Sequence, residues 1–149
     1  VRLLLSSILL SGYLPHIVVA EENFNTLGRL GYIYWDCAAF GNLMKEPPES
    51  SVKLFEKGHE MLSQFLDAAK SGRLTKENTS NVPIGLSWYF VSGPRIDFSL
   101  GYMWAKFSEE AHKETWTDLE LPEFNSQIEL QQAQARQAYQ DKNCEVLLK

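Results

Sequence analysis

Apolar residues recur every three or four positions through most of the chain, and this spacing predicts α-helices. We expect helices over residues 25–45 and 51–70, and a third that begins at Gly93-Pro94. The first is apolar on more than one side, so it should lie at the centre of the fold. The three apolar stripes consist of Leu30, Ile33, Tyr34, Cys37, Phe40, Gly41 and Met44; of Leu54, Phe55, Gly58, Met61, Leu62, Phe65 and Ala69; and of Ile96, Leu100, Met103, Trp104, Phe107 and Ala111.

Turn and capping residues indicate where these helices begin and end. Gly72 follows the second helix, and Pro94 suits the first turn of the third because a proline there gives up no hydrogen bond. A capping box, Ser126-Gln127-Ile128-Glu129, predicts the start of a last helix. The apolar face of that helix is thin and consists of Ile128, Ala135, Ala138 and Tyr139.

The apolar run at residues 83–91 is too short for its periodicity to decide between a buried strand and a buried short helix. We favour a helix because no partner strand is visible in the sequence. The predicted fold is therefore all-α. Residues 21–149 form a single-domain bundle of about four main helices plus one short irregular apolar segment.

Residues 1–20 have the layout of a secretory signal peptide, with Arg2 ahead of an apolar run that ends in Val18-Val19-Ala20. The alternatives are a membrane-spanning helix and a buried first helix, but Pro15 and the polar residues in the run favour a cleaved leader. Val1 in place of Met fits an alternative bacterial start codon, although a fragment would look the same. We expect an exported bacterial protein, periplasmic or secreted, with no membrane anchoring after cleavage.

The two cysteines, Cys37 and Cys144, are predicted to form a disulfide, because an even pair in an exported protein is most often bonded. A bond closing a loop of about a hundred residues would contribute on the order of 4–5 kcal/mol in the chain-entropy account. Two separate buried thiols become the better interpretation if the leader is not cleaved. A catalytic thiol is least favoured because the sequence contains no C-x-x-C motif.

Charge and motif content argue against several functions. The formal charge is −5, or −6 without residues 1–20, and the absence of a Lys/Arg cluster argues against a nucleic-acid partner. No phosphate-binding loop and no Gly-x-Ser-x-Gly elbow occurs, so nothing nominates catalytic residues or a cofactor. We therefore lean against an enzyme.

A doubled Glu-x-x-His motif, at Glu56 and His59 and again at Glu109 and His112, resembles the ligand pattern of di-iron helical bundles. Helical geometry argues against a metal site, because Glu56 lies about 155° from the centre of its apolar stripe at 100° per residue. Glu109 lies about as far from its own stripe. We predict no metal ligands.

Two further groups of residues are candidates for binding. Arg95 follows a Ser-Gly turn at a helix start and is a candidate for anion binding, whereas the alternative is an ion pair with Asp97. The acidic stretch at 106–129 contains aromatic residues, and the partner-binding candidates there are Trp116, Asp118, Glu120 and Phe124. The alternative is a solvated connector whose Trp116 and Phe124 pack on their own bundle.

These observations predict an exported, disulfide-tied helical protein that acts by binding a protein partner. Because this chain is acidic, we expect the partner to be basic. An inhibitor or an immunity protein would fit that description. The alternative is a periplasmic enzyme or metal-binding protein that uses His59 or His112 with nearby carboxylates.

Overall fold

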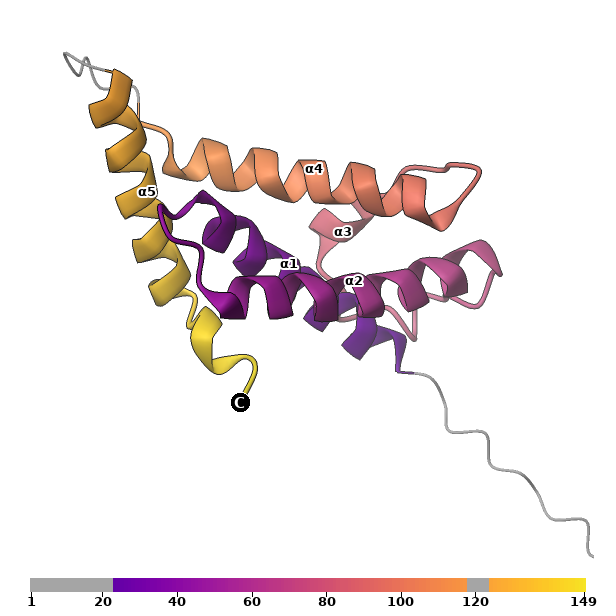
Figure 1. Cartoon of the computed structure of the whole chain (residues 1–149). Helices are drawn as coiled ribbons and strands as arrows, with labels where there is room; N and C mark the ends of the chain where they lie inside the picture. Colours follow the sequence, from indigo (N-terminus) through magenta and orange to yellow (C-terminus); the bar gives the residue numbers. More distant parts are fainter. Residues whose placement is uncertain (1–22, 118–123) are drawn as a thin grey trace, which may run out of the picture.

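The computed structural model describes residues 23–117 and 124–149, and the regular structure in these two ranges is entirely helical (Figure 1). Four α-helices are long and one is short, which confirms the predicted all-α fold of four main helices with one short apolar segment. The elements are α1 (Phe24–Leu43), α2 (Glu49–Lys70), α3 (Ile84–Tyr89), α4 (Ile96–Thr115), α5 (Phe124–Asp141) and a short 3₁₀ helix, η1 (Cys144–Val146).

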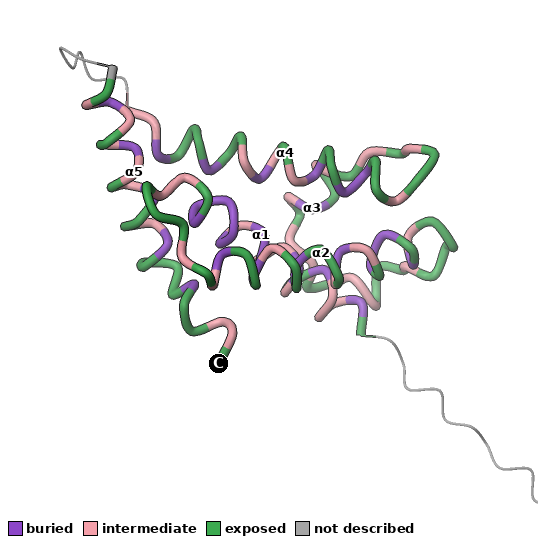
Figure 2. Tube along the Cα trace, viewed as in Figure 1, coloured by how far each residue is buried: buried purple, intermediate pink, exposed green. Residues whose placement is uncertain are grey.

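Helix α1 is the central element, as its apolar residues on several sides predicted. It packs against α2, α4 and α5, and half of its 20 residues are buried. In Figure 1, α2 and α4 run alongside one another, α3 lies between them, and α5 crosses the opposite end. Buried positions are dense along α1, whereas α2, α4 and α5 each alternate between buried and exposed positions (Figure 2).

An aromatic cluster around Trp35 joins three of the helices. The Trp35 ring is stacked on Phe55 of α2 at a centroid distance of 5.6 Å and meets Trp104 of α4 edge-on at 5.5 Å. Its indole N–H donates to the carbonyl oxygen of Phe55 at 3.0 Å, so the one polar atom of this buried ring is satisfied. The cluster therefore fixes α1 against both α2 and α4.

Close contact between α1 and α2 depends on small residues. A Cβ at Gly58 would lie 2.4 Å from Cδ1 of Trp35, so only a glycine leaves room for the indole ring. Further along the same pair, a Cβ at Gly41 would lie 2.4 Å from Cβ of the buried Ser51. The two backbones thus approach closely because neither position carries a side chain.

The disulfide between Cys37 and Cys144 ties the end of the chain to α1, as predicted. The two Cα atoms lie 5.6 Å apart, and both residues are fully buried. Tyr139 of α5, also buried, shares a hydrogen bond of 2.8 Å with the hydroxyl of Ser50 at the start of α2. Lys142 adds an ion pair of 3.0 Å to Asp36 of α1.

Some local predictions are wrong. Helix α4 begins at Ile96, with Arg95 as its extended N-cap, so Pro94 precedes the helix and is not in its first turn. Helix α5 begins at Phe124, two residues before Ser126, which is therefore not its N-cap. The prediction that residues 83–91 are buried also fails: α3 is a helix, but only Leu86 in it is buried.

The buried face of α5 differs in composition from the predicted apolar face. Ala135 and Tyr139 are buried, whereas Ile128 and Ala138 are half-buried. One and two turns before Ala135 the buried positions are Gln131 and Gln127. The amide of Gln131 bonds to Nδ1 of His112 at 2.8 Å, and that of Gln127 bonds to the carbonyl oxygen of Thr117. Two buried glutamines therefore occupy the contact of α5 with α4 and the residues after it, where apolar side chains were predicted.

The predicted signal peptide, residues 1–20, lies outside the residues that the structure describes. Within the described ranges, no helix combines the length and the hydropathy that crossing a bilayer requires.

Candidate functional site

Exposed apolar side chains are concentrated in residues 84–102, which we call the α3–α4 segment. Among the residues whose burial is described, seven large hydrophobic side chains are exposed, and five of them fall within these 19 positions. The five are Ile84, Trp88, Phe90, Phe98 and Tyr102. Isolated exposed hydrophobic residues are normal, whereas neighbouring ones that form an apolar patch mark interaction sites.

Helical geometry explains why these side chains face outward in α3. Leu86 is buried and Tyr89 meets Phe107 of α4 edge-on at 5.2 Å, so this side of α3 faces the bundle. Ile84 and Trp88 are one turn apart and lie on the other side, with 68% and 72% of their surfaces exposed. A helix of six residues buries only one face, and α3 turns its largest side chain away from the core.

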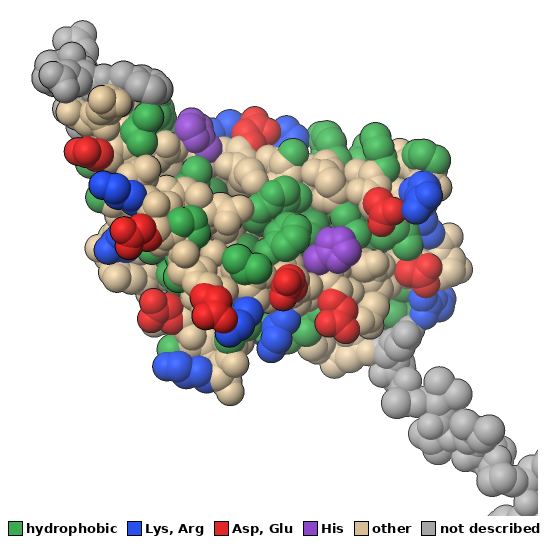
Figure 3. Space-filling view, viewed as in Figure 1, with side chains coloured by type: hydrophobic (Ala, Val, Ile, Leu, Met, Phe, Trp, Pro, Cys, Tyr) green, Lys and Arg blue, Asp and Glu red, His purple; other side chains and the backbone are tan. Residues whose placement is uncertain are grey.

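The same division occurs in α4. Leu100, Met103 and Phe107 are buried, as the predicted stripe requires. Phe98 and Tyr102 are again one turn apart and exposed, and hydrophobic side chains are visible along α4 in Figure 3. These exposed positions therefore lie outside the stripe that holds α4 on the bundle.

The connector between α3 and α4 is anchored to the first turn of α4. The hydroxyl of Ser99, which is buried, donates to the carbonyl oxygen of Val91 at 2.8 Å. Gly93 lets the ring of Phe98 approach the connector, because a Cβ there would lie 2.2 Å from Cδ1 of that ring. The connector that joins the exposed side chains of α3 to those of α4 therefore has defined contacts.

A cavity of about 540 Å³ adjoins the α3–α4 segment. It lies between the end of α2, the loop 71–83 and α3. Its described lining is mostly apolar and contains three hydroxyl side chains and one charged side chain, that of Lys76. The lining residues are Phe65, Leu66, Ala69, Leu74, Thr75, Lys76, Thr79, Val82, Pro83, Ile84, Leu86, Ser87 and Phe90.

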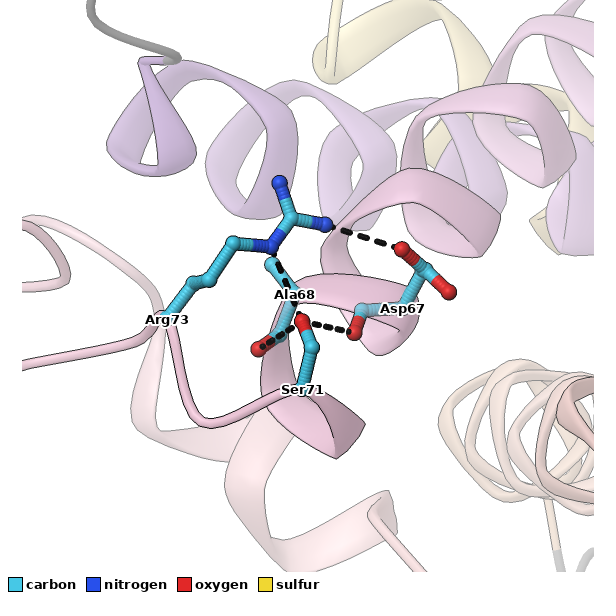
Figure 4. Close-up of polar contacts among 4 residues, drawn as sticks. All are labelled: Asp67, Ala68, Ser71 and Arg73. Carbon is cyan, nitrogen blue, oxygen red and sulfur yellow. Dashed lines mark hydrogen bonds and ion pairs between the residues drawn. The ribbon is translucent and has the colours of Figure 1, made fainter.

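The cap at the end of α2 positions the loop that forms one wall of this cavity. Gly72 has a φ of 70°, which glycine adopts without strain, and the N–H groups of Gly72 and Arg73 donate to Ala69 and Ala68. The Ser71 hydroxyl donates to the carbonyl oxygen of Asp67 at 2.8 Å, and Arg73 pairs with the Asp67 carboxylate at 2.8 Å (Figure 4). The chain therefore turns sharply out of α2 in a defined direction.

Arg95, the predicted anion-binding residue, is exposed at the start of α4. Its guanidinium pairs with Asp97 at 3.0 Å, which is the alternative that the sequence left open. The guanidinium and that carboxylate are both largely exposed. The positive charge at this helix start is therefore already matched by a neighbouring acid.

The predicted partner-binding residues are placed only in part. Trp116 is half-buried at the end of α4 and stacks at 5.4 Å on the ring of His112, one turn earlier in the same helix. Asp118 and Glu120 lie outside the described residues, and of Phe124 only the backbone at the start of α5 is described.

The acidic character of the neighbouring part of α4 is reduced by two lysines. Lys106 lies 2.6 Å from Glu109, while Lys113 pairs with Glu109 at 2.9 Å and with Glu110 at 3.2 Å. Hydrogen bonds from Lys106 and Lys113 lower the pKa of Glu109 to about 2. The carboxylate is therefore ionised and already engaged within its own helix.

His59 and His112 are not brought to a common site. His59 is exposed on α2 beside the rings of Trp35 and Phe55, whereas His112 bonds to Gln131 and stacks on Trp116. Glu56 and Glu109 are exposed, as helical geometry predicted. Within the described ranges, no three His, Cys, Asp or Glu side chains lie where they could hold a metal ion.

Tyr32 of α1 lies at the junction with α3 and α4. Burial raises its pKa to about 12, and Tyr89, Asp36 and Glu110 shift it in the same direction. Its ring meets Phe107 edge-on at 4.9 Å. The phenol is therefore held neutral at physiological pH and serves packing.

The sequence did not nominate the α3–α4 segment or the cavity. The available signal was the spacing of Ile84 and Trp88, and of Phe98 and Tyr102, each pair four residues apart and the second pair off the predicted stripe. Comparison of the chain with protein-family models, with curated proteins and with solved structures found no match.

Proposed function

We propose that this protein is an exported helical binding protein that captures a protein partner through the α3–α4 segment, as an inhibitor or immunity protein would. The observation that carries the proposal is the concentration of five exposed large hydrophobic side chains within residues 84–102. Trp and Tyr are the residues that most often dominate the binding energy of protein interfaces, and both occur here at exposed positions.

Charge supports the choice of partner. Without residues 1–20 the chain carries a formal net charge of −6, which attracts a basic protein over several ångströms and speeds its encounter. Within the α3–α4 segment the charges of Arg95 and Asp97 offset each other in an ion pair, so we expect the contact with the partner to be mainly apolar. We propose that the acidic surface steers the partner and that the aromatic side chains hold it.

Export is supported by the disulfide, because such bonds persist in the periplasm and outside the cell but are rare in the cytosol. We propose that the mature chain starts at Glu21. Mass analysis of protein isolated from the host is expected to show that start, with both sulfurs resistant to alkylation after denaturation. An intact leader with two free thiols would contradict export.

Site-specific photo-crosslinking in the host tests the partner. A photoreactive residue in place of Trp88 is expected to yield one protein adduct of discrete mass, whereas the same residue in place of the exposed Lys57 on the charged side of α2 should not. Adding Tyr102→Ser should weaken the adduct. The same set of adducts from both positions, or none from position 88, would contradict the proposal.

We do not propose the alternative of a shared catalytic or metal centre, because His59 and His112 have different neighbours and no observation favours one.

A further inference from the structure

We propose that the cavity between the end of α2, the loop 71–83 and α3 binds a single-chain amphiphile, with its apolar chain in the cavity and its anionic head group on Lys76. This ligand site shares Ile84 and Phe90 with the α3–α4 segment, but it differs from the rest of the surface proposed to capture a protein partner. Trp88, Phe98 and Tyr102, which carry much of that proposal, are not among the lining residues.

The size and lining of the cavity suit such a ligand. Small-molecule sites have volumes of about 300–1,000 Å³ and are lined mainly by apolar side chains with a few polar groups. This cavity has about 540 Å³, and nine of its 13 described lining residues are apolar. Leu66, Leu86 and Phe65 are buried lining residues, whereas Ile84 and Phe90 are exposed. An apolar ligand chain in the cavity would therefore contact the buried lining residues and cover the exposed side chains of Ile84 and Phe90.

Lys76 decides the chemistry of the head group. It is the one charged side chain in the described lining, and within the described ranges no carboxylate pairs with it. The adjacent Glu77 is held by a hydrogen bond with Thr75, which lowers its pKa. A cation beside an apolar cavity selects an amphiphile with a negative head group.

The hydroxyl groups of the lining do not compete with Lys76 as donors. Ser87 donates to the carbonyl oxygen of Ile84 at 2.7 Å, and Thr79 donates to that of Thr75 at 2.5 Å. The Thr75 hydroxyl is engaged with Glu77 and accepts from the N–H of Asn78 at 3.3 Å. The ammonium group is thus the donor that remains for a ligand.

The loop that carries Lys76 is held in place by its own contacts. The side chain of Asn78 accepts from the N–H of Thr75 at 2.7 Å and donates to the carbonyl oxygen of Arg73 at 2.9 Å. Further along, the N–H of Asn81 donates to Asn25 of α1 at 2.8 Å. The site is therefore largely formed before a ligand binds, which lowers the cost of binding.

Calorimetric titration of the full chain with n-alkyl carboxylates and n-alkyl trimethylammonium salts, all below their micelle concentrations, tests the site. Carboxylate affinity is expected to rise about four-fold per methylene until the cavity is filled. The cations should bind more weakly at equal chain length. Ala69→Phe, which fills the cavity, should abolish binding.

Charge variants separate the head-group contact from the apolar one. Lys76→Gln is expected to weaken carboxylate binding about ten-fold while the dependence on chain length remains. Lys76→Arg should restore affinity, and Lys57→Gln, a surface control, should change nothing. Trp88→Ser and Tyr102→Ser should leave amphiphile binding intact, so failure of the partner proposal is distinguishable from failure of this one.

Three outcomes would overturn the inference. The first is affinity that does not depend on chain length. The second is equal affinity for anionic and cationic amphiphiles that Lys76→Gln leaves unchanged. The third is binding to vesicles of anionic lipid without binding of the monomeric carboxylates, which would identify a membrane surface as the ligand.

Discussion

The α1–α2 pair and the α3–α4 segment each contain a tryptophan, but the first is buried and the second is exposed. Trp35 in α1 is 1% exposed, and Trp88 in α3 is 72% exposed. Trp35 lies over Gly58, which leaves space for the ring, and stacks on Phe55. Trp88 lies on the side of α3 opposite the buried Leu86. Trp35 is thus buried because α2 provides a surface that matches its ring, whereas Trp88 faces away from the helices that pack on α3.

The largest expected effect is the loss of core packing in the α1–α2 pair. Leu62→Ala, at a fully buried position of α2, is expected to lower the free energy of unfolding by about 2–5 kcal/mol. Val52→Ala on the exposed side of the same helix should change it by about 0.5 kcal/mol or less. Urea unfolding measures both, and equal losses would remove the contrast between core and surface.

Removal of the disulfide is expected to have the next largest effect. The double variant Cys37→Ala and Cys144→Ala should lose about 2–4 kcal/mol of unfolding free energy because the unfolded chain is no longer constrained; this is the typical effect of a disulfide and lies below the chain-entropy figure of about 4–5 kcal/mol. Chemical reduction of the unmodified protein is the control and should cause a comparable loss. A variant as stable as the oxidised protein would show that the bond does not hold the end of the chain to α1.

The close contact at Gly58 can be tested with a glycine in the other region as control. Gly58→Ala would place a Cβ 2.4 Å from Cδ1 of Trp35. The overpacking is expected to cost about 1–3 kcal/mol of unfolding free energy, against a gain of about 0.5–1 kcal/mol in helix propensity, so we expect a net loss. Gly101→Ala in α4 meets nothing within 4 Å and is expected to stabilise the protein by about 0.5–1 kcal/mol. If thermal unfolding gives both variants the same sign, the packing account is wrong.

The smallest expected effect concerns Tyr32, where the two regions meet. Its pKa is raised from the usual 10.0 to about 12 in the folded protein, so its contribution to stability is complete below pH 10. That contribution is lost as the pH rises from 10 through 12, because the unfolded chain ionises first. Tyr32→Phe should remove this part of the pH dependence in urea unfolding at pH 9 to 11. An unchanged dependence would show that Tyr32 ionises as freely in the folded protein.

Periodicity predicted the core of this fold because α1, α2 and α4 each bury most of the predicted stripe and leave its remaining residues half-buried. In the stripe of α4, Leu100, Met103 and Phe107 are buried as expected. Residues 83–91 could not be predicted in the same way, because a six-residue helix has too few turns to show which side is covered. The buried Gln127 and Gln131 were missed because amides enter a helix contact only where they find specific partners, such as His112.

The candidate site was less predictable than the fold for a physical reason. Motifs pointed to Arg95, which is already paired with Asp97, and to Trp116, which stacks on His112. The cavity brings together residues from α2, the loop 71–83 and α3, and their proximity depends on how the chain leaves α2. Apart from Gly72 and the cap at the end of α2, no local sequence pattern predicts the direction in which the chain leaves α2.

The exposed aromatic side chains of the α3–α4 segment can serve as a binding surface only if they do not hold the fold together. The direct measurement is the free energy of unfolding of the double variant Trp88→Ser and Tyr102→Ser in urea. We expect it to lie within about 1 kcal/mol of the unmodified protein, as for other exposed positions. A loss of about 2 kcal/mol or more, comparable to that of Leu62→Ala, would show that these side chains are structural and would contradict the proposed binding surface.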